Sequence, residues 1–299
     1  MAISQTRQRA IERAKGCFVH ACELDVAVRK PGNVSLASAG HGMTADVFIA
    51  SARAASGPLF EPGARVGERI EAAVEASWAA AGCNTNLGIV LLCAPIARAV
   101  DLWPDATAPP ALREAIDGVL HDLDLADAQG AFRAIARANP GGLGSAPDQD
   151  VNRPPSVDLR TAMALAARRD AIARLYRDGY GPLFELVSGV LEPGFSFDPS
   201  APDGTPDAGT VAAVLRLYLA LLGSVPDSHI VRIHGEAVAH TVMAAAQRWQ
   251  RQVGRHGGID ADPAFVAWDA TLKAQRINPG TTADMTVAAL LIAGLAARA

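Results

Sequence analysis

The chain has 299 residues, of which 50% are hydrophobic and only 5% aromatic, and its formal net charge is −4. A chain of this length can bury a sizeable core, and its slightly acidic balance excludes a general electrostatic attraction to nucleic acid. The four cysteines form no CxxC pair, which argues against a zinc ribbon or a redox motif. Few cysteines, no signal-peptide pattern and no apolar run of the roughly 20 residues that span a bilayer predict a cytoplasmic protein without membrane partners.

Apolar residues recur at helical spacing along most of the chain, beginning with a helix from Gln5 to about Val28. Further helices are predicted at about 44–58, 64–81, 89–100, 111–121, 124–138, 161–176, 179–191, 210–223, 227–253, 263–275 and from 282 onwards, with a proline-rich loop at 195–209. No segment shows the period-2 alternation and turn signals of a hairpin. The predicted fold is all-α, a single compact multi-helix domain over residues 1–299 with two buried central helices.

Two of these helices are apolar on every face, Ile89 to Val100 and Met285 to Leu295. A helix without a polar stripe has to be covered on all sides, so these two should lie next to each other in the core. Each follows a break rich in residues suited to helix N-caps, Gly82–Gly88 and Asn278–Asp284. Because the free N–H groups of a helix start attract phosphate, both breaks are candidate binding segments.

The segment Asn278–Asp284 opens the last helix and combines several helix-start signals. A Pro-Gly pair stops the preceding segment, and either Thr281 or Thr282 can cap the helix, with Asp284 in its first turn. The carboxylate is then free to face a ligand, so we predict that Asp284 is needed for activity but not for folding. An ordinary capped core helix is the alternative interpretation.

Two other regions carry polar residues that could bind a ligand. The longest irregular segment, Asn139 to Pro155, contains a glycine-rich run that is neither a Walker A loop nor a dinucleotide fingerprint, so it is a weak phosphate signal. Arg168, Arg169 and Arg174 lie in an alanine-rich helix, where they either reach phosphate oxygens or pair with acids on an exposed face. The absence of an HExxH motif makes a zinc site improbable.

Several motifs follow one another in the order of a known family and together span nearly the whole chain. They are Lys30–Val34, Gly40-His41 with Met43, Phe48 with Ser51, Gly82–Gly88, Asp227–Gly235 and Asn278–Asp284. On these residues the chain resembles the triphosphoribosyl-dephospho-CoA synthase family, whose members make the prosthetic-group precursor of citrate and malonate decarboxylases. The last motif is the most specific of the set.

The resemblance implies an all-α enzyme that uses ATP as a sugar donor. In the family's reaction, the 2′-hydroxyl of dephospho-CoA attacks C1 of the ATP ribose, adenine leaves, and the triphosphate stays on the transferred ribose. Such a transition state resembles an oxocarbenium ion, so the site needs a carboxylate to activate the hydroxyl and fixed donors for the triphosphate. The implied partners are ATP and a small-molecule acceptor, dephospho-CoA or a related compound, and a homodimer is compatible with this.

The family motifs, together with the chemistry of the individual side chains, predict roles for single residues. Catalytic roles fall on His41, Asp46 and Asp284. Substrate-binding roles fall on a larger set: Lys30, Asn84, Thr85, Asn86, Gly88, Arg168, Arg169, Arg174, Arg232, His234, Asn278, Gly280, Thr281 and Thr282. Magnesium is expected with the triphosphate, and Asp46, Asp150 and Asp284 are the acids that suit it.

The chain departs from the family pattern at two lysines. Asn86-Leu87 stand where the family usually has His-Lys, and Ile233 replaces the lysine of an Arg-Lys pair. The loop Gly40–Met43 also lacks the acid that usually precedes the methionine. Because a triphosphate needs cations to offset its charge, we expect at least one arginine of the alanine-rich helix to reach the same cleft as the two capped helix starts.

Two alternatives stay open at the level of sequence. The loop 141–144 and the helix 167–174 look more like a branch found in organisms that make tetrahydromethanopterin and related one-carbon cofactors. The first alternative is therefore an unassigned nucleotide- or phosphate-dependent step in the biosynthesis of tetrahydromethanopterin or methylofuran. The second is a non-catalytic helical nucleotide-binding protein, which the missing lysines fit and the retained Asp284 argues against.

Overall fold

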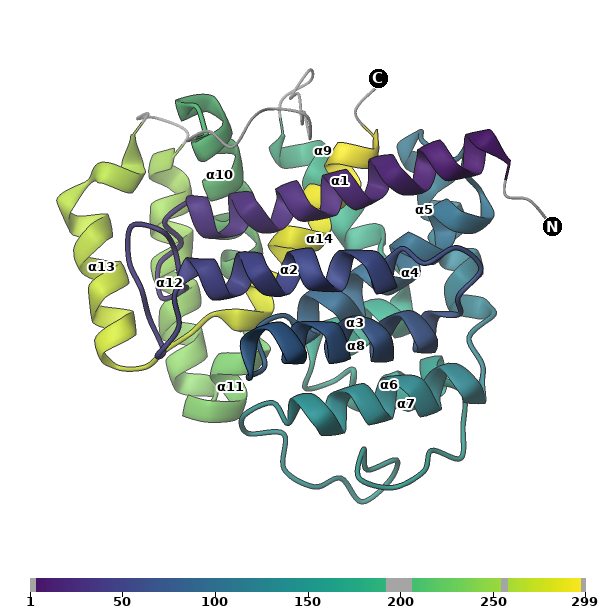
Figure 1. Cartoon of the computed structure of the whole chain (residues 1–299). Helices are drawn as coiled ribbons and strands as arrows, with labels where there is room; N and C mark the ends of the chain where they lie inside the picture. Colours follow the sequence, from purple (N-terminus) through teal and green to yellow (C-terminus); the bar gives the residue numbers. More distant parts are fainter. Residues whose placement is uncertain (1–3, 192–205, 254–257, 297–299) are drawn as a thin grey trace.

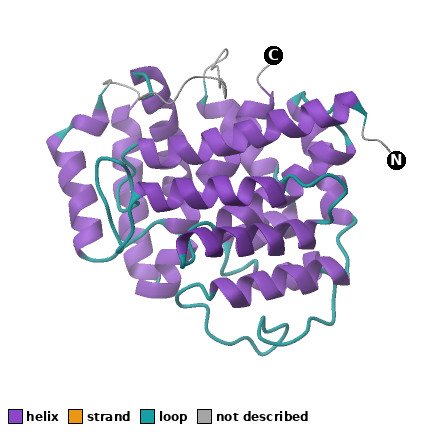
Figure 2. Cartoon of the chain, in the orientation of Figure 1, coloured by secondary structure: helices purple, strands orange, loops and turns teal. Residues whose placement is uncertain are grey.

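The computed structural model describes residues 4–191, 206–253 and 258–296, and within these ranges it consists of helices and loops without a strand (Figures 1 and 2). Its helices are α1 (Gln5–Ala27), α2 (Ala45–Leu59), α3 (Val66–Ala81), α4 (Leu87–Leu102), α5 (Pro109–His121), α6 (Leu125–Ala138), α7 (Leu159–Ala166), α8 (Ala171–Asp178), α9 (Gly181–Val190), α10 (Ala208–Ser224), α11 (Ser228–His234), α12 (Glu236–Val253), the short 3-10 helix η1 (Ile259–Ala261), α13 (Pro263–Ala274) and α14 (Gly280–Ala296). In the described part, no single helix is both long and apolar enough to cross a membrane, although the bent pair of α10 and α11 meets the length and composition criteria together. The predicted compact all-α fold is confirmed.

The two apolar helices, α4 and α14, run through the middle of the molecule and pack against each other (Figure 1). Helices α1, α5 and α8 contact both of them, α2, α3 and α6 cover α4, and α9, α10 and α11 cover α14. Every residue from Thr281 to Leu295 is buried except Asp284, which stays partly accessible. The prediction that these two helices lie side by side in the core is confirmed, and Asp284 marks the place where the core meets solvent.

Two predicted helices are broken in the structure. The predicted 161–176 helix is divided into α7 and α8, because the Asp170 carboxylate caps α8 by accepting a first-turn amide at 3.0 Å. The predicted 227–253 helix is divided into α11 and α12 at Gly235, whose φ of 85° does not belong to a right-handed helix. The predicted loop at 195–209 lies mostly outside the described residues.

A buried carboxylate near the end of α4 joins three helices. Asp101 accepts hydrogen bonds from Arg7 of α1 at 2.7 Å, Arg69 of α3 at 2.8 Å and Arg98 of α4 at 3.0 Å, and also from the Gly63 amide at 3.0 Å. Arg69 is itself buried, and this burial lowers its pKa to about 10. The packing of α1, α3 and α4 therefore depends on one buried negative charge.

Candidate functional site

A cavity of about 640 Å³ lies where the starts of α4, α8, α11 and α14 meet the loops 31–43 and 139–151. Most of the predicted site residues line it: His41, Asn84, Thr85, Gly88, Asp150, Arg169, Arg232, Asn278, Gly280, Thr281 and Asp284. Motifs that are far apart in the sequence thus converge on one cavity. Arg169 reaches the cavity that the two capped helix starts line, as we expected of one of the three arginines.

The other predicted site residues do not line the cavity. Asp46 and Arg168 are exposed, Lys30, Asn86 and Thr282 are buried without lining it, and Arg174 and His234 bond to backbone carbonyls. Asp46 is exposed because the opposite face of α2 packs against α1 and α3. Lys30 pairs with the cavity residue Asp25, and Thr282 donates to Asp227, while their part in binding stays a prediction.

Asp284 lies on the cavity wall and has no hydrogen bond or ion pair with any other described residue. Burial raises the pKa of Asp284 well above 3.8, the negative charges of Asp25 and Asp227 raise it further, and Arg232 opposes them. A carboxyl group whose pKa is raised by its surroundings holds a proton more tightly than an exposed carboxyl group does. Asp284 is therefore a stronger base than an exposed aspartate, which suits a group that accepts a proton.

Gly88, in the first turn of α4, is the residue against which Asp284 packs. A Cβ atom at this position would lie 2.0 Å from Asp284 Oδ2, so only glycine leaves room for the carboxylate. We predict that Gly88→Ala folds but loses about 10²-fold in kcat, because the carboxylate has to move and a displacement of about 1 Å costs that much. The matched control is Gly57→Ala in α2, where a Cβ atom meets no atom within 4 Å. Equal kcat for Gly88→Ala and the native protein would contradict the prediction.

The start of α14 is capped by a residue from a different helix start. The helix begins at Gly280, so Asp284 lies in the second turn rather than the first, and neither threonine is the cap. Instead, Asp227 Oδ2 accepts the amide and the hydroxyl of Thr282, each at 2.7 Å. Its Oδ1 accepts two amides at the start of α11 at 2.9 and 3.0 Å. One buried carboxylate thus caps both helices, which leaves the Asp284 carboxylate free, as predicted.

Helix α11 brings a cationic group to the cavity wall. Arg232 donates to Asp170 at 3.0 Å and to Nδ1 of His229 at 3.4 Å. Burial and the nearby charge of Arg232 lower the pKa of His229 to about 4, so its imidazole is neutral at neutral pH. Arg232 was predicted from its motif, whereas Asp170 and His229 were not. Asp170 could have been found as a helix cap, and His229 belongs to the same motif as Arg232.

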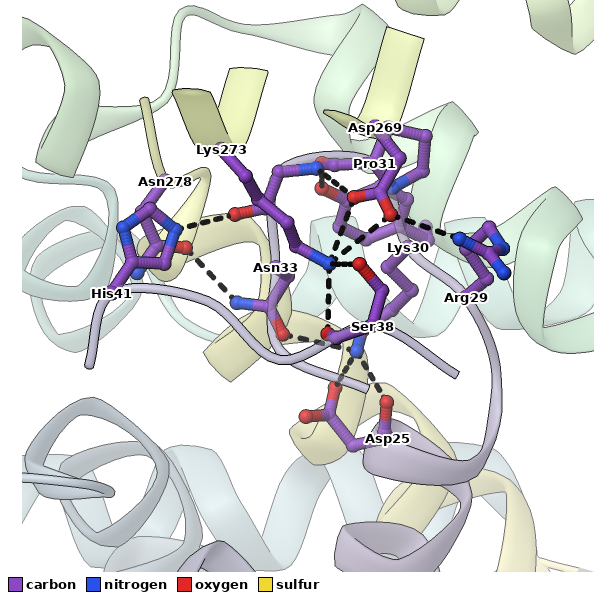
Figure 3. Close-up of polar contacts among 12 residues, drawn as sticks. Asp25, Arg29, Lys30, Pro31, Asn33, Ser38, His41, Asp269, Lys273 and Asn278 are labelled. Carbon is purple, nitrogen blue, oxygen red and sulfur yellow. Dashed lines mark hydrogen bonds and ion pairs between the residues drawn. The ribbon is translucent and has the colours of Figure 1, made fainter. Parts of the chain in front are cut away.

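Loop 31–43 supplies Asn33, His41 and Met43 to the cavity lining, and Figure 3 shows the polar contacts of Asn33 and His41. His41 Nε2 donates to the carbonyl of Gly32 at 2.8 Å, and Asn33 donates to Asn278 at 3.0 Å. Lys30 is buried beneath the loop and pairs with Asp25, a cavity residue that sequence reasoning missed, at 3.0 Å. The sequence signal for Asp25 is weak, because an acid inside a long amphipathic helix is usually exposed.

The three acids expected to hold magnesium do not form one site. Asp46 is exposed, whereas Asp150 lines the cavity and accepts the amides of Asn152 and Ala146, each at 2.9 Å. These bonds lower the pKa of Asp150, so it is ionised at neutral pH. The described residues contain no group of three or more His, Cys, Asp or Glu side chains that could hold a metal ion.

Helix starts and arginines that surround one cavity suit the binding of a phosphorylated small molecule. The model of the ATP:dephospho-CoA triphosphoribosyl transferase family matches residues 11–299, and the chain belongs to this family of transferases. No curated protein matches the chain in sequence. These findings favour neither the one-carbon-cofactor alternative nor the non-catalytic one.

Among solved structures, the chain is similar to one from Archaeoglobus fulgidus that is provisionally assigned as a triphosphoribosyl-dephospho-CoA synthase. The two chains are 22% identical with a TM-score of 0.63, and the similarity covers 84% of this chain and 98% of the other. At this level of identity the similarity shows a shared fold.

Proposed function

We propose that this protein transfers the triphosphoribosyl group of ATP to the 2′-hydroxyl of dephospho-CoA and releases adenine, and that the cavity at the starts of α4 and α14 is the active site. The observation that carries this proposal is Asp284. It is a carboxylate without a hydrogen-bond or ion-pair partner among the described residues, on the wall of a cavity lined by arginines, and its pKa is raised well above 3.8. A merely structural carboxylate would be expected to find a partner at this depth.

The transfer forms a bond between the acceptor oxygen and C1 of the ATP ribose and breaks the bond from C1 to adenine. The hydroxyl proton passes to Asp284 and from there, through solvent, to the departing adenine, so that protons and charge balance. Because positive charge develops on the ribose in the transition state, the Asp284 carboxylate also stabilises it electrostatically until the proton transfer is complete. Both effects depend on a carboxylate held at the cavity wall.

The cations on the cavity wall suit the triphosphate. Arg169, Arg232 and Arg276 all line the cavity, and the guanidinium group binds phosphate oxygens through two parallel bonds. Ile233, which replaces a family lysine, contacts the glycine-rich loop instead: its Cδ1 lies 2.8 Å from where a Cβ of Gly142 would be. In our proposal, these arginines replace the charge of the missing lysines.

Asp150 is the residue we propose to hold magnesium. It is an ionised carboxylate on the cavity wall, and magnesium in nucleotide sites takes only one or two carboxylates, with phosphate oxygens and water as its other ligands. The ion would neutralise part of the triphosphate charge when ATP is bound.

The direct test incubates the purified protein with ATP, dephospho-CoA and magnesium, and measures free adenine and the mass of the product. We expect adenine and triphosphoribosyl-dephospho-CoA in equal amounts, and neither of them when dephospho-CoA is left out. Adenine release without an acceptor adduct, or turnover only with a different acceptor, would contradict the proposed substrate. Chelation of magnesium is expected to stop the reaction.

A second measurement tests the arginine assignment. Arg232→Met is expected to raise the KM for ATP by about 10- to 100-fold, since a charged hydrogen bond contributes about 1.5–3 kcal/mol. Arg168→Met is the matched control, because Arg168 is exposed and does not line the cavity. A similar KM for the two variants would remove Arg232 from the binding site.

A further inference from the structure

The loop 31–43 connects α1 to α2 and contains no helix or strand, yet it presents Asn33, His41 and Met43 to the cavity. Behind this loop lies α13, none of whose residues lines the cavity. Figure 3 shows that side chains of α13 point towards the loop and join it through a set of polar contacts. These contacts have no direct part in the proposed reaction, but they hold a loop that presents residues to the cavity.

Asp269 of α13 is fully buried and is the centre of these contacts. Its Oδ1 accepts the amide of Gly32 at 2.9 Å, and its Oδ2 accepts Arg29 at 3.2 Å and Lys273 at 3.1 Å. Lys273 in turn donates to the carbonyl of Ser38 at 2.9 Å and to its hydroxyl at 2.7 Å. The α13 pair of Asp269 and Lys273 therefore fixes the loop at two points.

Gly32 connects this pair to the cavity. While its amide donates to Asp269, its carbonyl accepts Nε2 of His41 at 2.8 Å. Its φ is 81°, and a Cβ atom would lie 2.8 Å from the Ile277 carbonyl oxygen and from Pro279 Cδ, so the peptide has little freedom to shift. The position of the Gly32 peptide, and with it that of the His41 imidazole, therefore depends on Asp269.

His41 needs such support. Its φ of 55° lies in the left-handed region, which a residue other than glycine keeps only where its surroundings impose it. Because Nε2 donates to a carbonyl, Nδ1 is the nitrogen left to accept a hydrogen bond. The orientation and the tautomer of His41 therefore follow from the position of Gly32.

We propose that Asp269 is a positioning residue for His41: through Gly32 it fixes the imidazole in the Nε2–H tautomer, with Nδ1 offered as acceptor to a hydroxyl or amino group of the bound substrate. This proposal rests on the proposed function in one respect, namely that His41 contacts substrate.

The test is a double-mutant cycle with Asp269→Asn and His41→Gln, measured as kcat under saturating substrate. Asp269→Asn is expected to lower kcat about 10-fold in the native background, but by less than about twofold when His41 is already glutamine, because coupled residues are not additive. Asp262→Asn is the matched control, since its carboxylate caps the same helix and, among the described residues, accepts only the Ala264 amide. The control should leave kcat unchanged in both backgrounds.

A second readout does not depend on turnover. The ¹⁵N chemical shifts of the His41 ring are expected to show the Nε2–H tautomer in the native protein and in Asp262→Asn, and a mixture of tautomers in Asp269→Asn. If Asp269→Asn does not fold, Lys273→Met removes the second anchor of the loop and is measured in the same cycle.

Equal losses of kcat in the two backgrounds, or an unchanged tautomer, would overturn the proposal and leave Asp269 with a structural role alone. Full activity of His41→Gln would instead contradict the part that His41 plays in the proposed function. In that case a tautomer shift in Asp269→Asn would still support the connection through Gly32.

Discussion

Asp284→Asn is expected to lower kcat by about 10²–10⁴-fold, the range found when a general base is removed, while the protein stays folded. The substitution keeps the shape of the side chain and removes its charge and its ability to take up a proton. Folding should not suffer, because Asp227 rather than Asp284 caps α14. The measurement is kcat together with the melting temperature of the unliganded protein.

The raised pKa of Asp284 predicts how the stability of the native protein and of Asp284→Asn should differ with pH. The pKa of Asp284 is raised in the folded protein above its ordinary value of 3.8. Its contribution to stability is therefore fully present below pH 3.8 and is lost as pH rises through the raised pKa. Asparagine does not titrate, so at pH 8 the melting temperature of Asp284→Asn should equal or exceed that of the native protein. This difference in melting temperature should shrink as the pH falls towards 4.

Asp46→Asn is the control for this experiment. Asp46 is exposed at the start of α2 and does not line the cavity, so the variant should keep its activity and its pH profile. Near-native kcat combined with a much lower melting temperature in Asp284→Asn would show that the carboxylate is structural and would refute the proposed active site.

Asp101→Asn is expected to destabilise the protein by about 3–5 kcal/mol, the cost of leaving a buried charge without its partner. Arg69 is buried and keeps its charge, so the loss of the Asp101 charge leaves three arginines facing one another around a neutral amide. Chemical denaturation of both proteins measures the free energy of unfolding directly.

The exposed Asp105, just beyond α4, provides the matched control. Asp105→Asn should change the free energy of unfolding by no more than about 0.5 kcal/mol, as is usual for surface substitutions. If Asp101→Asn were as mild as this control, the charge at Asp101 would not be needed to hold α1, α3 and α4 together.

Much of the fold could be predicted because its cause is local in the sequence. The apolar stretches from Ile89 and Met285 have no polar face, and that property alone requires burial and neighbours on every side. The polar residues just before these stretches then have to lie at the edge of the core, which is where the cavity is. Local pattern was sufficient for these features.

Other features depend on partners that are distant in sequence. The cap of α14 comes from Asp227, whose bond to Thr282 spans 55 residues, and no local pattern indicates it. The break before α8 depends on Asp170 acting as a cap, where the alanine-rich composition favours a continuous helix. That break decides which arginine reaches the cavity, and it selects Arg169.

The face that a helix turns to the core is likewise set by tertiary packing. Asp46 is suited to magnesium by its chemistry, but α2 exposes it to solvent. The expected cytoplasmic location, the homodimer and the absence of nucleic-acid and membrane partners are untested by these findings and stay predictions.

The shared cap at Asp227 couples the motions of two walls of the proposed active site. Helix α11 carries Arg232 and α14 carries Asp284, and both begin on the same carboxylate. If either helix start opens, it withdraws donors from Asp227 and weakens the other, so the two walls of the cavity fluctuate together rather than independently. A phosphate that contacts Arg232 alone would then slow hydrogen exchange of the amides at the start of α14 as well. Binding at the start of α11 would thus order the start of α14.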